Sequence, residues 1–67
     1  MMFQVLGLRK VPDTDPQEYE LRLKDKENTK PGYIGRMEYG TEAEVRVMLR
    51  DGGMSESDIE RLFKQAA

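Results

Sequence analysis

Residues 18–24 read EYELRLK, and this segment sets the architecture expected for the 67-residue chain. Tyr19, Leu21 and Leu23 alternate strictly with charged residues. Alternation over this length is typical of a strand in an antiparallel sheet, with one face on the core and the other in solvent. The segment therefore predicts a half-buried β-strand with a charged outer face.

Two more strands are predicted, one on each side of this segment along the chain. Residues 3–11 are apolar on both faces, and Gly7 interrupts them, which often marks a β-bulge. Residues 33–39 repeat the alternation, so the large side chains that share one parity are expected in the core: Tyr33, Met37 and Tyr39. Proline and glycine at residues 12–16 and 31–32 indicate turns between the strands.

The C-terminal part of the chain predicts two amphipathic helices, over residues 41–51 and 55–66. Each begins with a capping box, in which Thr41 or Ser55 accepts a backbone hydrogen bond and an acidic residue three positions later reaches back. Apolar residues at helical spacing follow, and in the second helix they are Ile59, Leu62, Phe63 and Ala66. Gly52 is expected in the left-handed conformation that ends the first helix, so the two helices fold back as a hairpin.

These elements follow the order β-β-β-α-α, with no repeat and no internal linker. We therefore expect residues 1–67 to form one small α+β domain, in which a three-stranded antiparallel sheet packs on a C-terminal helical hairpin.

No apolar stretch approaches the ~20 residues needed to cross a membrane, so no membrane partner is expected. The lack of cysteine and of a leader sequence favours a cytoplasmic protein.

Composition argues against several kinds of chemistry. The chain has no histidine and no cysteine, which excludes a thiol nucleophile, an imidazole base, a disulfide framework and a zinc finger. Asp13 and Asp15 lie in a proline-bounded turn and not in the buried setting that acid–base catalysis by a carboxylate requires, and the later ligands of a calcium loop are missing. We expect a non-enzymatic protein that uses no cofactor and no metal.

A second small ridge on the helix over residues 41–51 is the first candidate site. Ala43 and Val47 form this ridge, and Arg46 and Arg50 flank it. Two interpretations stay open, because the ridge can lie buried beneath the sheet or can contact another protein. The second interpretation makes the chain a protein–protein interaction module, with adaptor, inhibitor and assembly-factor roles all compatible. A homodimer joined through the first strand is a further expectation, because a small domain gains stability from dimerisation.

The alternative function is nucleic-acid binding through a basic hairpin around residues 22–36. Its candidate phosphate contacts are Lys24, Lys26, Lys30 and Arg36. Cations that flank a long hairpin can follow a phosphate backbone while a tyrosine stacks on a base. Interleaved acidic residues and a net charge of −2 reduce the positive field, which makes this the second interpretation.

Overall fold

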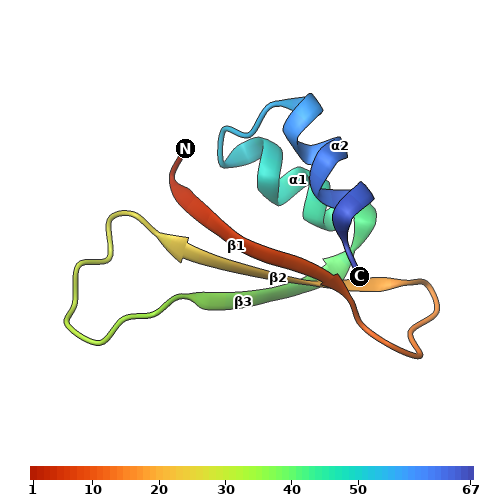
Figure 1. The fold of residues 1–67 in the computed structure, drawn as a ribbon, viewed down its shortest axis with the longest axis horizontal. Coiled ribbons are helices and arrows are strands. Elements are labelled where there is room, and N and C mark those ends of the chain that lie inside the picture. The colour runs from red at the N-terminus through yellow and green to blue at the C-terminus, as the bar shows by residue number, and fades with distance from the viewer.

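The computed structural model describes all residues from 1 to 67. Three strands, β1 (Phe3–Lys10), β2 (Glu18–Asp25) and β3 (Arg36–Thr41), precede two helices, α1 (Glu42–Asp51) and α2 (Glu56–Gln65). The strands form one antiparallel sheet in the order β1-β2-β3. Both helices cover the same face of this sheet (Figure 1). The predicted β-β-β-α-α arrangement of an α+β protein is confirmed.

The core lies between the apolar face of β2 and the two helices. Its seven buried side chains come from β1, β2, α1 and α2: Phe3, Tyr19, Leu21, Leu23, Val45, Leu49 and Ile59. The ring of Tyr19 meets that of Phe63 edge-on, with the ring centres 5.0 Å apart. The alternation in residues 18–24 therefore places the inward-facing side chains of β2 as predicted.

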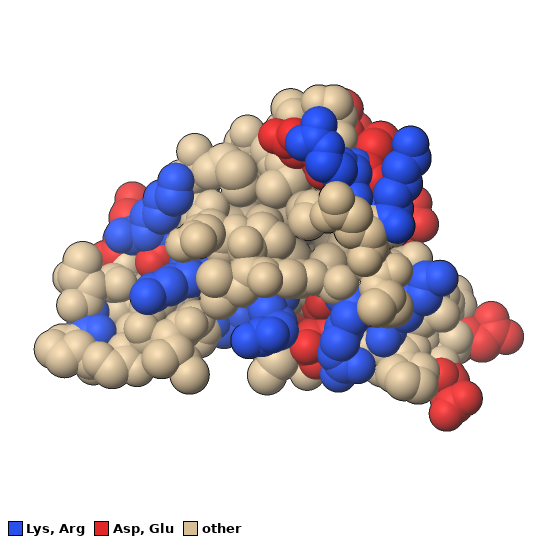
Figure 2. All heavy atoms as spheres, viewed as in Figure 1, with Lys and Arg blue, Asp and Glu red and all other residues tan.

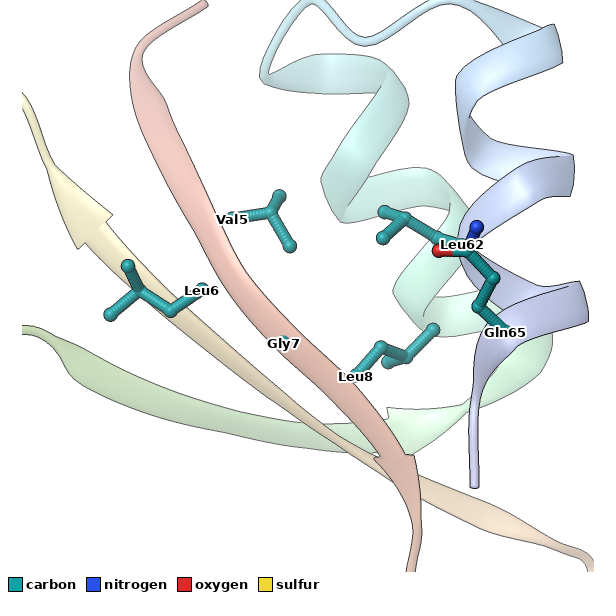
Figure 3. A pocket seen from close by; sticks show the side chains of 6 residues that line it. All are labelled: Val5, Leu6, Gly7, Leu8, Leu62 and Gln65. Carbon is teal, nitrogen blue, oxygen red and sulfur yellow. The ribbon is translucent and has the colours of Figure 1, made fainter.

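The predicted bulge is present in β1, next to Gly7. Val5 lies opposite Leu23 and Gly7 lies opposite Arg22, so Leu6 is the extra residue without a partner. Figure 3 shows that Val5 and Leu8 point toward the helices, whereas Leu6 points to the opposite face of the sheet. The bulge thus explains why β1 is apolar on both faces.

The predicted core positions in the third strand are wrong. Tyr33 precedes β3, and the register places Met37 opposite Arg22 and Tyr39 opposite Glu20. Directly opposed residues in antiparallel strands share a face, and the alternating charges of β2 lie on the face away from the helices. Met37 and Tyr39 therefore lie on that outer face, where each is 55% exposed.

The helix ends follow the predicted caps with two differences. Thr41 forms a complete capping box with Glu44. Ser55 accepts a hydrogen bond from the amide of Asp58, but the Asp58 carboxylate accepts one from Arg61 instead of reaching back to the cap. The left-handed residue after α1 is Gly53 (φ 99°), not Gly52, because Gly52 keeps a helical φ of −75°.

Gly52 is needed for space. A Cβ at this position would lie 2.4 Å from ring atoms of the buried Phe3, whereas a Cβ at Gly7 would meet no atom within 4 Å. We expect Gly52→Ala to lower the free energy of unfolding by about 1–3 kcal/mol, because the Phe3 ring must move out of a packed core. Gly7→Ala is the matched control, with an expected change within about 0.5 kcal/mol. Urea denaturation measures both, and equal effects would contradict this role of Gly52.

Candidate functional site

The face of the sheet away from the helices, which we call the outer face, carries most of the exposed large apolar side chains. Leu6 is 42% exposed and Ile34 is 83% exposed, and Met37 and Tyr39 are each 55% exposed. Leu6, Ile34 and Met37 line a common hollow of about 130 Å³, and the Tyr39 hydroxyl lies 3.7 Å from the sulfur of Met37. We call Leu6, Ile34, Met37 and Tyr39 the outer patch.

The aromatic ring of the outer patch is held by a charged network. The side chain of Glu20 is only 8% exposed and accepts two hydrogen bonds from Arg9, Nε to Oε1 at 3.1 Å and Nη2 to Oε2 at 2.9 Å. The Tyr39 hydroxyl donates to the same Oε2 at 3.2 Å. These three side chains come from three neighbouring strands, so the sheet itself positions the Tyr39 ring.

The hydrogen bonds of this network shift two pKa values. The hydrogen bonds from Arg9 lower the pKa of Glu20, and the bond from Tyr39 lowers it further, against the effect of burial. The pKa of Tyr39 is raised, first by its hydrogen bond to the Glu20 carboxylate and then by burial. Glu20 is therefore held as a carboxylate and Tyr39 as a neutral phenol, which suits positioning of a ring rather than proton transfer.

The outer patch is flanked by cations that have no intramolecular partner. Arg22 and Lys24 are exposed on β2, and neither forms an ion pair. Figure 2 shows basic side chains gathered along the lower side of the molecule, beneath the sheet, while acidic side chains project at the end that carries the β1–β2 turn. The apolar outer patch thus lies in a locally positive setting.

The ridge predicted on α1 faces solvent and is not part of the core. Ala43 is exposed and Val47 is 50% exposed. Arg46 donates to Glu42 at 2.8 Å and to Glu60 of α2 at 2.6 Å. Its guanidinium also lies 4.7 Å from the centre of the Phe63 ring, a cation–π contact.

Arg50 pairs with Glu56 across the helical hairpin. Two of the four predicted contact residues, Arg46 and Arg50, therefore connect α1 to α2 within the chain. Ala43 and Val47 are left as the solvent-facing part of the ridge.

The basic hairpin is only partly free. Lys24, Lys26 and Lys30 are exposed and form no ion pair. Arg36 instead donates to both carboxylate oxygens of Asp25, at 2.7 and 3.2 Å, and also pairs with Glu38. The Arg36 hydrogen bonds lower the pKa of Asp25, and so does the hydroxyl of Tyr33, which donates to it at 2.9 Å. Three of the four predicted phosphate contacts are thus available, and Tyr33 is held by Asp25.

The molecule also has a hollow of about 300 Å³ that lies between α2 and the free edge of β1 (Figure 3). It is lined by Val5, Leu6, Gly7, Leu8, Leu62 and Gln65, so no titratable side chain points into it. No group of three or more metal-ligating side chains is assembled elsewhere. None of the helices has the length and apolar character needed to cross a membrane.

The outer patch is not predicted from the sequence, because the alternation in residues 33–39 is interpreted as placing Met37 and Tyr39 in the core. Alternation in residues 36–39 shows that the two side chains share a face, but it does not say which face. The register with β2 supplies that information, and the register depends on a turn ten residues long. Gly40 is a signal in the sequence for the correct face. A residue without a side chain fits the inner position next to the first turn of α1, and Met37 and Tyr39, which have the opposite parity, then lie on the outer face.

Glu20 gives a pH-dependent contribution to stability. Because the pKa of Glu20 is lower in the folded chain, its contribution is complete above the ordinary glutamate pKa of about 4.3 and is lost as the pH falls through the folded value. We expect Glu20→Gln to be less stable than the wild type at pH 7, with the difference shrinking in acid. Urea denaturation from pH 7 to about pH 3 measures this, with the exposed loop variant Glu27→Gln as a charge-matched control. Parallel curves for Glu20→Gln and the wild type would contradict the prediction.

Comparison of the chain with models of protein families, with characterised proteins and with solved structures finds no significant match.

Proposed function

We propose that this chain is a small, non-enzymatic protein-binding module whose main contact surface is the outer patch. The observation that carries the proposal is the amount of apolar surface left open. Four large apolar side chains lie together on the outer face of a chain that buries only seven apolar side chains in its core. A contiguous exposed apolar patch with a polar rim is a mark of interaction sites.

The outer patch also has the construction of a binding surface. Tyr39 is an aromatic anchor whose position is fixed in advance by Glu20 and Arg9, which reduces the entropy lost on binding. Arg22 and Lys24 border the patch without carboxylate partners of their own. The surface therefore favours a protein partner that presents apolar side chains flanked by carboxylates.

The ridge on α1 is a second contact surface within the same proposal, formed by Ala43 and Val47 with Arg46 and Arg50 beside them. Adaptor, inhibitor and assembly-factor roles all fit a module of this kind, and a cytoplasmic location remains part of the proposal. A homodimer through the first strand also remains a prediction. The bulge at Leu6 argues against it, because bulges at sheet edges discourage the addition of strands.

Paired substitutions test the two surfaces against each other. We expect Ile34→Asp to lower recovery of the protein partner at least about tenfold, because it places a charge in the apolar contact while the exposed position leaves folding intact. Val47→Asp should lower recovery less if the outer patch is the main surface. The measurement is affinity capture from lysate by each tagged variant, quantified by mass spectrometry, with half of each sample treated with nuclease. Unchanged recovery with Ile34→Asp would contradict the assignment of the outer patch.

Nucleic-acid binding is the second candidate, and the exposed, unpaired Lys24, Lys26 and Lys30 favour it. If these three lysines contact phosphates, the logarithm of the affinity for a single strand should fall with a slope of about −2 against the logarithm of salt concentration. Replacing all three with glutamine should flatten this slope. Fluorescence anisotropy with a labelled oligonucleotide measures both quantities. A salt-independent affinity, or capture that survives nuclease, would exclude this candidate in favour of protein binding.

A further inference from the structure

The outer edge of β3 has unpaired backbone groups. Lys26 donates its backbone N–H to the carbonyl of Met2, and Val11 donates its backbone N–H to the carbonyl of Glu18. The backbone N–H and C=O groups of the even-numbered residues of β2 therefore point toward β1. Backbone groups alternate in direction along an antiparallel strand, so the N–H and C=O groups of the odd-numbered residues of β2 point toward β3. Their β3 partners are Arg36, Glu38 and Gly40. The N–H and C=O groups of Met37 and Tyr39 consequently point away from the sheet.

Nothing in the chain covers this edge. None of the backbone hydrogen bonds formed outside the helices and strands involves Met37 or Tyr39. The next outward amide, that of Thr41, donates to the Glu44 side chain at 2.9 Å and belongs to the cap of α1. The opposite edge of the sheet is different, because the Lys10 amide in β1 donates to the carbonyl of Ala67 at 2.8 Å.

The side chains along the β3 edge have a self-complementary order. Arg36 and Glu38 flank Met37 and share the face of the strand turned toward the helices. An antiparallel copy of this strand centred on Met37 places each arginine directly opposite the glutamate of the other copy. Opposite charges in directly opposed positions stabilise strand pairing, and like charges destabilise it.

We propose that a second copy of this chain docks on the β3 edge, antiparallel, with Met37 of the two copies directly opposite each other. The Met37 residues then exchange two backbone hydrogen bonds, and two Arg36–Glu38 pairs lie across the seam. The result is a continuous six-stranded sheet.

Neighbouring symmetric registers are less favourable. Centring the pair on Glu38 places two carboxylates directly opposite each other at the two-fold axis. Centring it on Tyr39 requires the amide of Thr41, which is already bonded to Glu44. Charge and hydrogen-bonding capacity therefore both select the register centred on Met37.

This inference goes beyond the proposed binding function, because edge pairing leaves the outer face open. In the dimer the two outer patches meet at the paired Met37 residues and form one apolar strip that spans both copies. The dimer would thus present a larger surface to a protein partner than either copy alone.

Cysteine cross-linking tests the register in a chain that has no cysteine of its own. Directly opposed Cα atoms in a hydrogen-bonded pair are about 5.5 Å apart, within the range that a disulfide spans. We expect Met37→Cys to form a covalent dimer under mild oxidation faster than Glu38→Cys and than Val47→Cys, a half-exposed control on α1. Cross-linking of Met37→Cys no faster than Val47→Cys, or slower than Glu38→Cys, would overturn the proposal.

A charge exchange tests the specificity of the pairing. Arg36→Glu and Glu38→Arg should each raise the dimer dissociation constant by about tenfold or more, because both cross-strand pairs become repulsive. The double variant should return the constant to within about threefold of the wild type, since opposite charges face each other again. Sedimentation equilibrium measures the constants, and circular dichroism checks the fold, because Arg36 also pairs with Asp25 in its own chain.

Two results of the charge exchange would overturn the proposal. One is a wild type that stays monomeric up to about 1 mM, and the other is a folded double variant no better than the single ones. If Arg36→Glu fails to fold, Glu38→Arg and the cross-linking still decide the question. The charge-exchange variants leave the apolar residues of the outer patch unchanged, so with them failure of the dimer is distinguishable from failure of partner binding.

Discussion

The strand β2 separates two environments, and the rest of the molecule is arranged around that separation. Its odd-numbered side chains, among them the buried Leu21 and Leu23, pack beneath both helices. Its even-numbered side chains lie on the outer face, where only Glu20 is buried. The chain has two helices and both are needed to cover the apolar side, so no element remains to cover the other side. An open outer face is therefore a consequence of how this chain builds its core.

The register that fixes the core also determines what the outer face displays. Leu6 reaches that face because of the bulge in β1, and Met37 and Tyr39 reach it because their partners in β2 are charged residues. Tyr39 is then tied to Glu20, and Glu20 to Arg9, so the three strands are linked by side chains as well as by backbone. The helical layer has a corresponding link in Arg46, which joins Glu42 to Glu60 and covers Phe63. Ionic contacts thus hold each layer, while the apolar core holds the layers together.

Much of this fold follows from local patterns, and the failures have a common cause. Alternation places Tyr19, and the Thr41 cap begins α1, because both signals depend on residues close in sequence. Three other features depend on contacts between residues far apart in the chain. They are the face occupied by Met37, the space required at Gly52 and the pairing of Arg36 with Asp25. The predicted α1 ridge shows the same limit, because helical spacing finds a second stripe but does not say whether a sheet lies over it. The sequence located candidate residues, and their availability was set by partners that only the folded chain brings near.

The continuity of β3 with α1 explains why the β3 edge stays open. Thr41 is both the last residue of the strand and the cap of the helix, so α1 begins over the inner face without a linker that would let it reach the edge. An uncovered edge invites indiscriminate strand pairing, and charged side chains are one way in which proteins prevent it. Arg36 and Glu38 supply such charges, and within one chain Arg36 pairs with both Glu38 and Asp25. An unrelated strand must displace these charges without compensation, whereas an antiparallel copy of β3 offers each charge its opposite. The same two residues therefore disfavour pairing with an unrelated strand and favour pairing with a second copy of β3.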